Sequence, residues 1–127
     1  LRGWQAWRVI TMTGLSGLER QGAASLPSDL AAQGIGWRHL PVDDFGTPSV
    51  EVDAAWPAVS ATAQDHLWQG GRVLVHCFGG CGRSGMACLR LMVEAGEPPE
   101  TALARLRAAR PCAVETEAQM RWAIGPA

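Results

Sequence analysis

The segment from Arg72 to Gly85 constrains the fold of this chain more than any other stretch. It begins with a continuous apolar run, Arg72–Cys77 (RVLVHC), which has glycines on both sides. Such a run is typical of a strand buried in the centre of a parallel sheet. A glycine-rich turn follows, and an apolar segment from about Ser84 to Ala95 predicts a helix that ends at Gly96. A strand, a tight turn and a helix in this order indicate an α/β fold.

Strands and helices are predicted to alternate along the rest of the 127 residues. Apolar runs with β-branched residues predict further strands at Trp7–Met12 and Ile35–Leu40. Apolar periodicity and boundary residues predict further helices at Leu26–Gln33, Ser49–Gln69, Pro99–Arg110 and from Thr116 to beyond Trp122. We therefore expect a single domain over residues 1–127, of the α/β class, with a central, mostly parallel sheet flanked by helices.

The longest of these predicted helices is amphipathic. Ser49 can cap its first turn, because a serine oxygen accepts a backbone hydrogen bond there. The apolar residues spaced along one face are Val52, Trp56, Val59, Ala63 and Leu67. We expect this face to be buried.

The charge balance excludes several kinds of partner. The chain has 11 basic and 12 acidic residues and a formal net charge of −1, whereas nucleic acids and anionic membranes usually select a basic surplus. Its apolar stretches are far shorter than a membrane span. All of the basic residues are arginine, which we interpret as a GC-rich codon bias and hence a bacterial source. We expect a cytoplasmic monomer without nucleic-acid or membrane partners.

The four cysteines indicate neither a zinc ribbon nor a disulfide framework. Cys77, Cys81, Cys88 and Cys112 show no paired CxxC spacing, so we expect reduced thiols and no bound metal or cofactor. Cys88 and Cys112 are expected in the core. For Cys81, packing is favoured over reversible pairing with Cys77, because a tight loop must deform to join the two sulfurs.

The turn after the apolar strand has the composition of an oxyanion-binding loop. Its glycines let successive backbone N–H groups point into one concavity, and the following helix adds the positive end of its dipole. Arg83 can close this cradle with a planar fork that binds two oxygens of a phosphoryl group. The residues predicted to bind phosphate are Phe78, Gly79, Gly80, Cys81, Gly82 and Arg83.

Cys77 lies at the base of this positive field. A thiol in such surroundings ionises more readily than a free thiol, whose pKa is about 8.5, so a thiolate is available to attack phosphorus. Ser84 can donate a hydrogen bond to the sulfur when it departs, and His76 is expected to order the loop. The alternative for Cys77 is a buried, inert thiol, which is the commoner fate of a single cysteine.

This segment resembles the phosphate-binding loop of the cysteine-dependent protein tyrosine and dual-specificity phosphatases. Residues 76–85 (HCFGGCGRSG) match the family pattern HCxxGxGRSG at every specified position. The resemblance implies a protein tyrosine phosphatase-like fold and a reaction through a cysteinyl-phosphate. It favours catalytic roles for Cys77, Arg83 and Ser84.

A second similarity lies upstream, at residues 41–48 (PVDDFGTP). This stretch is similar to the P-[IV]-x-D-x-G-x-P loop of the kinase-associated phosphatase (cyclin-dependent kinase inhibitor 3-like) branch of the dual-specificity enzymes. In that register Asp44 is the general acid that protonates the leaving group, and Asp43 is its variable neighbour. The alternative is an acidic surface turn.

A third similarity involves Thr116 and Gln119, which fit the T-x-x-Q that begins the last helix in the same branch. The family glutamine is thought to orient the water that hydrolyses the cysteinyl-phosphate. The alternative is a helix cap at Thr116 followed by an exposed glutamine. The resemblance extends from about Ile35 to Trp122.

Three functions remain open at this point. The first is hydrolysis of phosphomonoesters, above all protein phosphotyrosine, phosphoserine and phosphothreonine. The second is a rhodanese-like sulfurtransferase or arsenate reductase, which needs no acid upstream of the cysteine. The third is a non-catalytic phospho-binding module on a phosphatase scaffold. Asp44 and the Gly-Arg-Ser-Gly sequence favour the first.

Overall fold

The computed structural model describes residues 7–12, 36–42, 46–76 and 82–124. Its strands are β1 (Trp7–Thr11), β2 (Gly36–His39) and β3 (Arg72–His76), and all pair in parallel in the order β2-β1-β3. The predicted α/β class and parallel sheet are confirmed. The predicted helix at Leu26–Gln33 lies outside the described residues.

The register of the sheet brings the carboxyl ends of the strands to one edge. Thr11 in β1 pairs with His39 in β2 and with His76 in β3, so the three strands end side by side. The segments that follow β2 and β3 therefore leave the sheet from the same edge. In α/β proteins this edge is where ligands usually bind.

The prediction that the strand before the cysteine is central is wrong for the described sheet. β1 occupies the centre, and over the described residues β3 pairs with β1 alone. The side chain of Leu74 in β3 is 40% exposed. An apolar run can belong to a central strand or an edge strand, and only the pairing distinguishes them.

Helix α3 (Val50–Trp68) begins where the sequence predicts, because Oγ of Ser49 accepts a hydrogen bond from the backbone N–H of Val52 at 3.2 Å. Such a cap stabilises a helix by about 1 kcal/mol. The predicted face is buried at Val52, Trp56, Val59 and Ala63. Leu67 is 41% exposed, which corrects its expected burial, because the last turn extends past the core.

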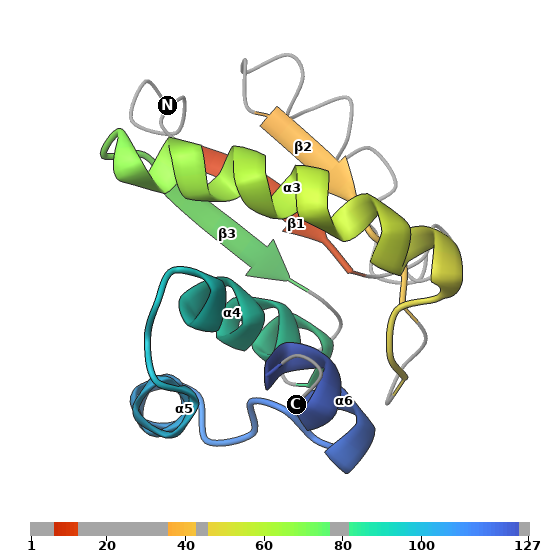
Figure 1. Ribbon diagram of the computed structural model, residues 1–127, viewed down its shortest axis with the longest axis vertical. Coiled ribbons are helices and arrows are strands. Elements are labelled where there is room, and N and C mark those ends of the chain that lie inside the picture. The colour runs from red at the N-terminus through yellow and green to blue at the C-terminus, as the bar shows by residue number, and fades with distance from the viewer. Residues whose placement is uncertain (1–6, 13–35, 43–45, 77–81, 125–127) are drawn as a thin grey trace.

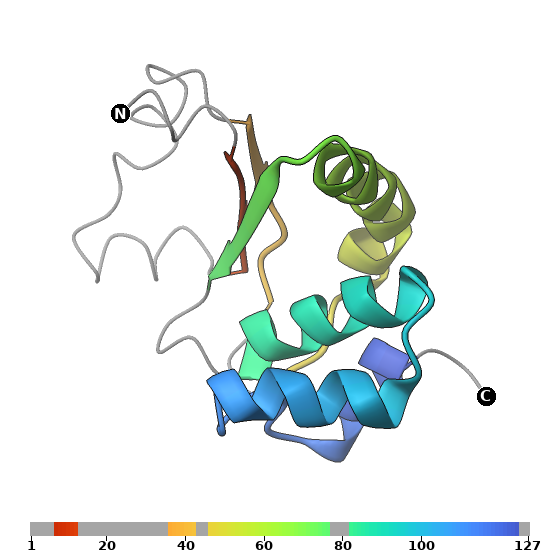
Figure 2. The same cartoon turned by 90° about the vertical axis from the view of Figure 1, so that its left-hand side faces the viewer.

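The other described helices follow β3 along the chain. They are α4 (Gly82–Glu94), α5 (Pro99–Ala109) and α6 (Glu117–Ile124). Figures 1 and 2 show α3 across one face of the sheet, and α4, α5 and α6 grouped near the carboxyl ends of the strands. Helix α4 starts two residues earlier than predicted, so Gly82 and Arg83 belong to its first turn.

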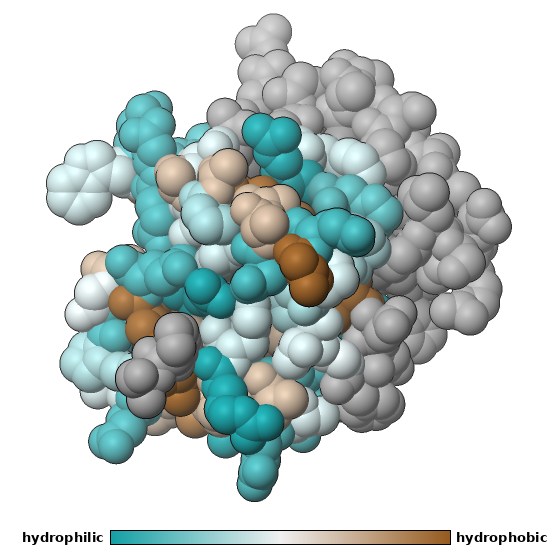
Figure 3. All heavy atoms as spheres, turned by 45° about the vertical axis from the view of Figure 1, so that its right-hand side comes forward, coloured by the Kyte–Doolittle hydropathy of each residue, from teal (hydrophilic) through white to brown (hydrophobic). Residues whose placement is uncertain are grey.

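One hydrophobic core joins the sheet to these helices. Trp56, Met86 and Leu89 are fully buried in it, together with Ile10 and Met12 from the central strand and its end. On the face shown in Figure 3, hydrophilic and neutral side chains cover most of the described surface, and strongly hydrophobic ones form small separate spots. Among the described helices, none is both long and apolar enough to cross a membrane.

Candidate active site

The N-terminus of α4 carries the described part of the predicted phosphate-binding loop. Gly82, Arg83 and Ser84 are all buried, with Arg83 6% exposed and Ser84 5% exposed. Cys77, Phe78, Gly79, Gly80 and Cys81 lie outside the described residues, as does the side chain of His76. Figure 1 shows α4 beyond the carboxyl end of β3. The first N–H groups of a helix have no partner within the helix and can bind an anion there.

The guanidinium of Arg83 reaches the segment that precedes the candidate acid. Its Nη1 donates a hydrogen bond of 2.9 Å to the carbonyl of Val42. Val42 is held in turn by the central strand region, because its N–H donates to the carbonyl of Met12 at 3.0 Å. Arg83 therefore connects the start of α4 to the segment that precedes the candidate acid.

Gln119 is fully buried, which corrects the alternative of an exposed glutamine. Its Oε1 accepts hydrogen bonds from the N–H groups of Glu115 at 2.9 Å and of Thr116 at 3.3 Å. Thr116 does cap the helix, since its Oγ1 accepts from the N–H of Gln119 at 3.0 Å. The Thr116 cap and the hydrogen bonds to Oε1 together fix the Gln119 carboxamide at the start of α6.

The same carboxamide contacts the far side of the predicted acid loop. Nε2 of Gln119 donates a hydrogen bond of 3.0 Å to the carbonyl of Gly46, a contact between residues 73 positions apart. Asp43 and Asp44 lie outside the described residues, but Val42 and Gly46 flank them on either side. Arg83 therefore holds one flank of this segment, and Gln119 holds the other.

The structure also places a residue at the site that the sequence analysis did not select. Oε1 of Glu115 accepts a hydrogen bond of 2.9 Å from the backbone N–H of Gly82. A methyl group on Gly82 would collide with this carboxylate and would lie 2.7 Å from Oε1 of Gln119. Any larger residue at this position would require the side chains of Glu115 and Gln119 to shift. No spacing signal in the sequence singles out Glu115 from the neighbouring acidic residues.

A strained turn immediately precedes Glu115. Val114 has a φ of +64°, a conformation that is rare for a β-branched residue. Arg107 in α5 stabilises the turn, because Nε donates to the carbonyl of Ala113 and Nη2 donates to the carbonyl of Val114, both at 3.0 Å. This turn directs the chain from α5 back towards Gly82 and Gln119.

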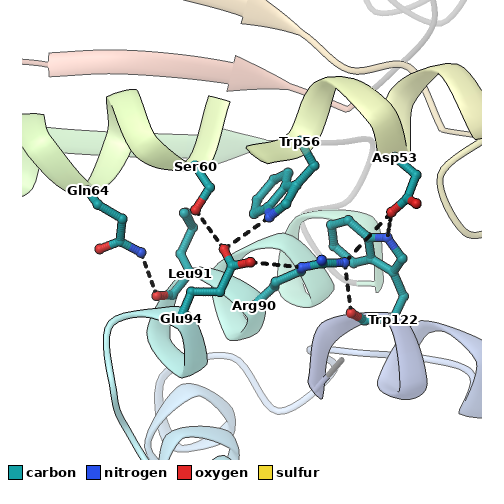
Figure 4. A network of polar contacts seen from close by, with 8 residues as sticks. All are labelled: Asp53, Trp56, Ser60, Gln64, Arg90, Leu91, Glu94 and Trp122. Carbon is teal, nitrogen blue, oxygen red and sulfur yellow. Dashed lines mark hydrogen bonds and ion pairs between the residues drawn. The ribbon is translucent and has the colours of Figure 1, made fainter. Parts of the chain in front are cut away.

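Helix α6 is tied to its neighbours by a polar network (Figure 4). Nη1 of Arg90 donates a hydrogen bond of 3.2 Å to the carbonyl of Trp122, and the guanidinium carbon lies 4.4 Å from the centre of the Trp122 ring. The indole N–H of Trp122 donates to Oδ1 of Asp53 at 2.9 Å. These contacts fix the orientation of the helix that carries Gln119.

The network continues from α4 to α3 through Glu94. Oε2 of Glu94 pairs with Arg90 at 3.2 Å, while its Oε1 accepts hydrogen bonds from the indole of Trp56 at 3.0 Å and from Oγ of Ser60 at 2.6 Å. A carboxylate with three partners in a partly buried position is well compensated for its lost hydration. The three helices around the site therefore form one connected unit (Figure 4).

The comparison with known families agrees with this geometry. The sequence model of the family PTP-SAK, described as "Swiss Army Knife protein, DSP-PTPase phosphatase domain", matches residues 27–122. The chain belongs to this phosphatase family. The match includes the candidate acid loop, the phosphate-binding loop and α6, which are the segments that the described contacts bring together.

Relatives within the phosphatase superfamily support the same assignment. Cyclin-dependent kinase inhibitor 3 of Mus musculus is 36% identical over 78 residues, and that of Rattus norvegicus is 35% identical over 79 residues. These matches cover 61% of this chain and 36% of either relative. The chain thus spans about a third of the length of the curated relatives that it matches.

Solved structures of phosphatases share the fold. The active form of Tk-PTP is 32% identical, with a TM-score of 0.71 over 90% of this chain and 73% of that chain. Kinase associated phosphatase, solved with its catalytic cysteine replaced by serine, gives a TM-score of 0.79 over 96% of this chain and 68% of that chain. Its identity of 22% supports the fold alone.

The remaining cysteines of this DSP-PTPase domain differ from expectation. Cys88 is half-buried and forms no disulfide, but Cys112 is exposed and disulfide-bonded, so the expectation that Cys112 is a reduced core residue is wrong. It follows α5 directly in an irregular segment, where the helical spacing that suggested burial no longer applies. Within the described part of the chain, no group of His, Cys, Asp and Glu side chains could hold a metal ion.

Proposed function

We propose that this chain hydrolyses phosphomonoesters through a cysteinyl-phosphate intermediate. The observation that carries the proposal is the pair of contacts at the candidate acid loop. Arg83, from the phosphate-binding segment, holds Val42, while Gln119, from the last helix, holds Gly46. A nucleophile loop, an acid loop and a water-orienting residue are the parts that a two-step hydrolysis requires.

The short segment between the two held flanks supports a role for its two aspartates. Only residues 43–45 separate Val42 from Gly46, and an extended chain advances by about 3.3–3.6 Å per residue. Asp43 and Asp44 are therefore tethered within a few ångströms of backbone that contacts Arg83 and Gln119. Such tethering supports the general-acid interpretation over an unconnected surface turn.

The proposed reaction has two displacement steps. In the first, the thiolate of Cys77 forms a bond to phosphorus while the bond to the ester oxygen breaks, and Asp44 supplies a proton to the departing oxygen. In the second, water attacks phosphorus, Asp44 takes its proton, and the thiolate of Cys77 leaves. Gln119 orients that water, and the hydroxyl of Ser84 stabilises the departing sulfur.

Arg83 and the backbone N–H groups of residues 78–83 bind the transferred phosphoryl group in this proposal. The charge of the three equatorial oxygens remains high throughout, so fixed donors in a water-poor site lower the barrier. His76 orders the loop, and Asp43 adjoins the acid. The strands that precede the acid loop and the nucleophile loop end at the same edge of the sheet, which supports this arrangement.

We further propose that the substrate is a phosphorylated protein or a small phosphomonoester. One structural neighbour is a kinase associated phosphatase, and another, PTPMT1, was solved in complex with PI(5)P. We propose tyrosine, serine and threonine phosphates as the first substrates to test. We also propose that the chain is a monomer in the bacterial cytoplasm and acts without a nucleic-acid or membrane partner.

Steady-state assays test the proposed activity directly. We expect the reduced chain to hydrolyse p-nitrophenyl phosphate in the presence of EDTA, and vanadate to inhibit this hydrolysis competitively. Transfer of sulfur from thiosulfate to cyanide, measured in parallel, tests the sulfurtransferase alternative. Absence of hydrolysis together with sulfur transfer would reject the proposal, and oxyanion binding without turnover would favour a binding module.

The Asp44→Ala variant tests the identity of the general acid. We expect a rate loss of about 10²–10⁴-fold for alkyl phosphates, whose leaving groups require protonation, and a much smaller loss for p-nitrophenyl phosphate. Asp43→Ala is the matched control, since it removes a carboxylate from the adjacent position. Equal losses in the two variants would contradict the assignment of Asp44.

A further inference from the structure

The carboxylate of Glu115 lies where a bound phosphoryl group needs hydrogen-bond donors. Its Oε1 is 2.9 Å from the backbone nitrogen of Gly82, the first residue of α4. In the proposed function this N–H belongs to the phosphate-binding loop. A carboxylate and a phosphoryl group are both oxyanions, and both seek backbone donors at the start of a helix.

Several contacts hold the Glu115 backbone in this place. Its N–H is bonded to Oε1 of Gln119 at 2.9 Å, and Arg107 fixes the carbonyls of the two preceding residues. Val114 keeps a φ of +64°, a backbone conformation that is unfavourable for a residue other than glycine. The surroundings therefore impose the turn that brings Glu115 to Gly82.

We propose that Glu115 is a specificity-determining residue that competes with the substrate's phosphoryl group for the N-terminus of α4. This inference rests on the proposed phosphatase function of the same loop. In the free protein the carboxylate occupies the Gly82 N–H, and a phosphoryl group must displace it. Glu115 thereby lowers the affinity of the site for oxyanions that bring no compensating positive charge.

The expected effect is large because the two anions lie close together. Even when displaced, the carboxylate remains near a phosphoryl group bound at Gly82. Two like charges about 4 Å apart repel each other, although solvent screens part of this repulsion because Glu115 is exposed. Simple oxyanions should consequently bind about tenfold more tightly once this charge is removed.

The alternative role for Glu115 is to position the N–H of Gly82. If the contact with Glu115 instead orders Gly82 for phosphate binding, loss of the carboxylate would weaken oxyanion binding. The two roles predict changes of opposite sign, so a single binding constant separates them. The contacts of Gly82 with Glu115 and Gln119 are compatible with either role. The effect of removing the Glu115 charge on phosphate binding distinguishes the two.

The experiment measures the inhibition constant of inorganic phosphate against p-nitrophenyl phosphate hydrolysis in Glu115→Gln. Glutamine keeps an oxygen that can accept from Gly82 but removes the charge. We expect the inhibition constant to fall about tenfold and the KM to fall in parallel. Glu117→Gln is the matched control, because it removes an exposed carboxylate two residues further along and should leave both constants unchanged.

Glu115→Ala provides a second variant that removes both the charge and the hydrogen bond. Tighter phosphate binding in both Glu115 variants supports competition, whereas unchanged or weaker binding in both overturns it. A wild-type chain that does not hydrolyse p-nitrophenyl phosphate would instead reject the proposed function. The two proposals therefore fail in different measurements. Thermal unfolding of each variant confirms that the compared proteins are folded.

Discussion

Replacing Cys77 by serine is expected to abolish hydrolysis of p-nitrophenyl phosphate while leaving oxyanion binding intact. A serine hydroxyl is not ionised at neutral pH, so it cannot replace a thiolate as the nucleophile. Loss of a catalytic nucleophile typically lowers kcat by about 10⁴-fold or more. The backbone donors and Arg83 remain, so tungstate should still bind, which calorimetry can measure.

The control for this variant is Cys88→Ser. Cys88 is a half-buried thiol in α4, so its substitution tests whether loss of any thiol lowers activity. We expect Cys88→Ser to retain turnover. Residual activity of Cys77→Ser near that of the wild-type chain would show that another residue is the nucleophile, and the cysteinyl-phosphate mechanism would be wrong.

Arg83→Lys is the second variant with a large expected effect. We expect kcat/KM for p-nitrophenyl phosphate to fall by about 10²–10³-fold, the usual cost of removing one transition-state donor. Lysine keeps the charge but lacks the planar fork, so it cannot hold the carbonyl of Val42 and two phosphoryl oxygens together. The affinity for vanadate should fall in the same assay.

Arg105→Lys controls for the general effect of replacing an arginine. The Arg105 side chain is 66% exposed and pairs with Glu97, so a lysine there can keep a surface ion pair. Its kinetics should match those of the wild-type chain. If Arg83→Lys also kept more than about half of the wild-type activity, the fork would not be required and the phosphate-binding role of Arg83 would be contradicted.

The local pattern of the sequence predicts most elements of this fold. The β-branched runs identify β1 and β2, and the serine before α3 and the glycines after α3 and α4 identify helix boundaries. These signals predict strands and helix ends correctly because such elements depend on residues close together in the sequence. The position of β3 does not follow from such signals, because parallel pairing joins residues far apart in the chain. Among the described strands, the centre is occupied by β1 and not by β3 as predicted.

The candidate site, like the sheet, could be predicted only in part from the sequence. The T-x-x-Q spacing selects Thr116 and Gln119, but it cannot distinguish an exposed glutamine from a buried one. The structure buries Gln119 and joins it to Gly46, a contact that only the folded chain creates. The roles of Cys77 and Asp44 remain predictions from the sequence.

Glu115 shows why one residue escaped the sequence analysis altogether. Its place depends on the positive φ of Val114, and a valine gives no sign of such a conformation because glycine or asparagine would be expected there. It also depends on a cation in α5 that bonds two consecutive carbonyls. Neither signal lies in the spacing of chemically reactive residues.

The turn at Val114 has a consequence for how this domain can change over time. A residue better suited to a left-handed backbone would relieve this strain, but it would also give up the burial of the Val114 side chain in the hydrophobic core. The two effects change the stability of the folded state in opposite directions at one position. The same packed turn therefore carries both a cost in backbone strain and a gain in core packing, and Glu115 follows it directly.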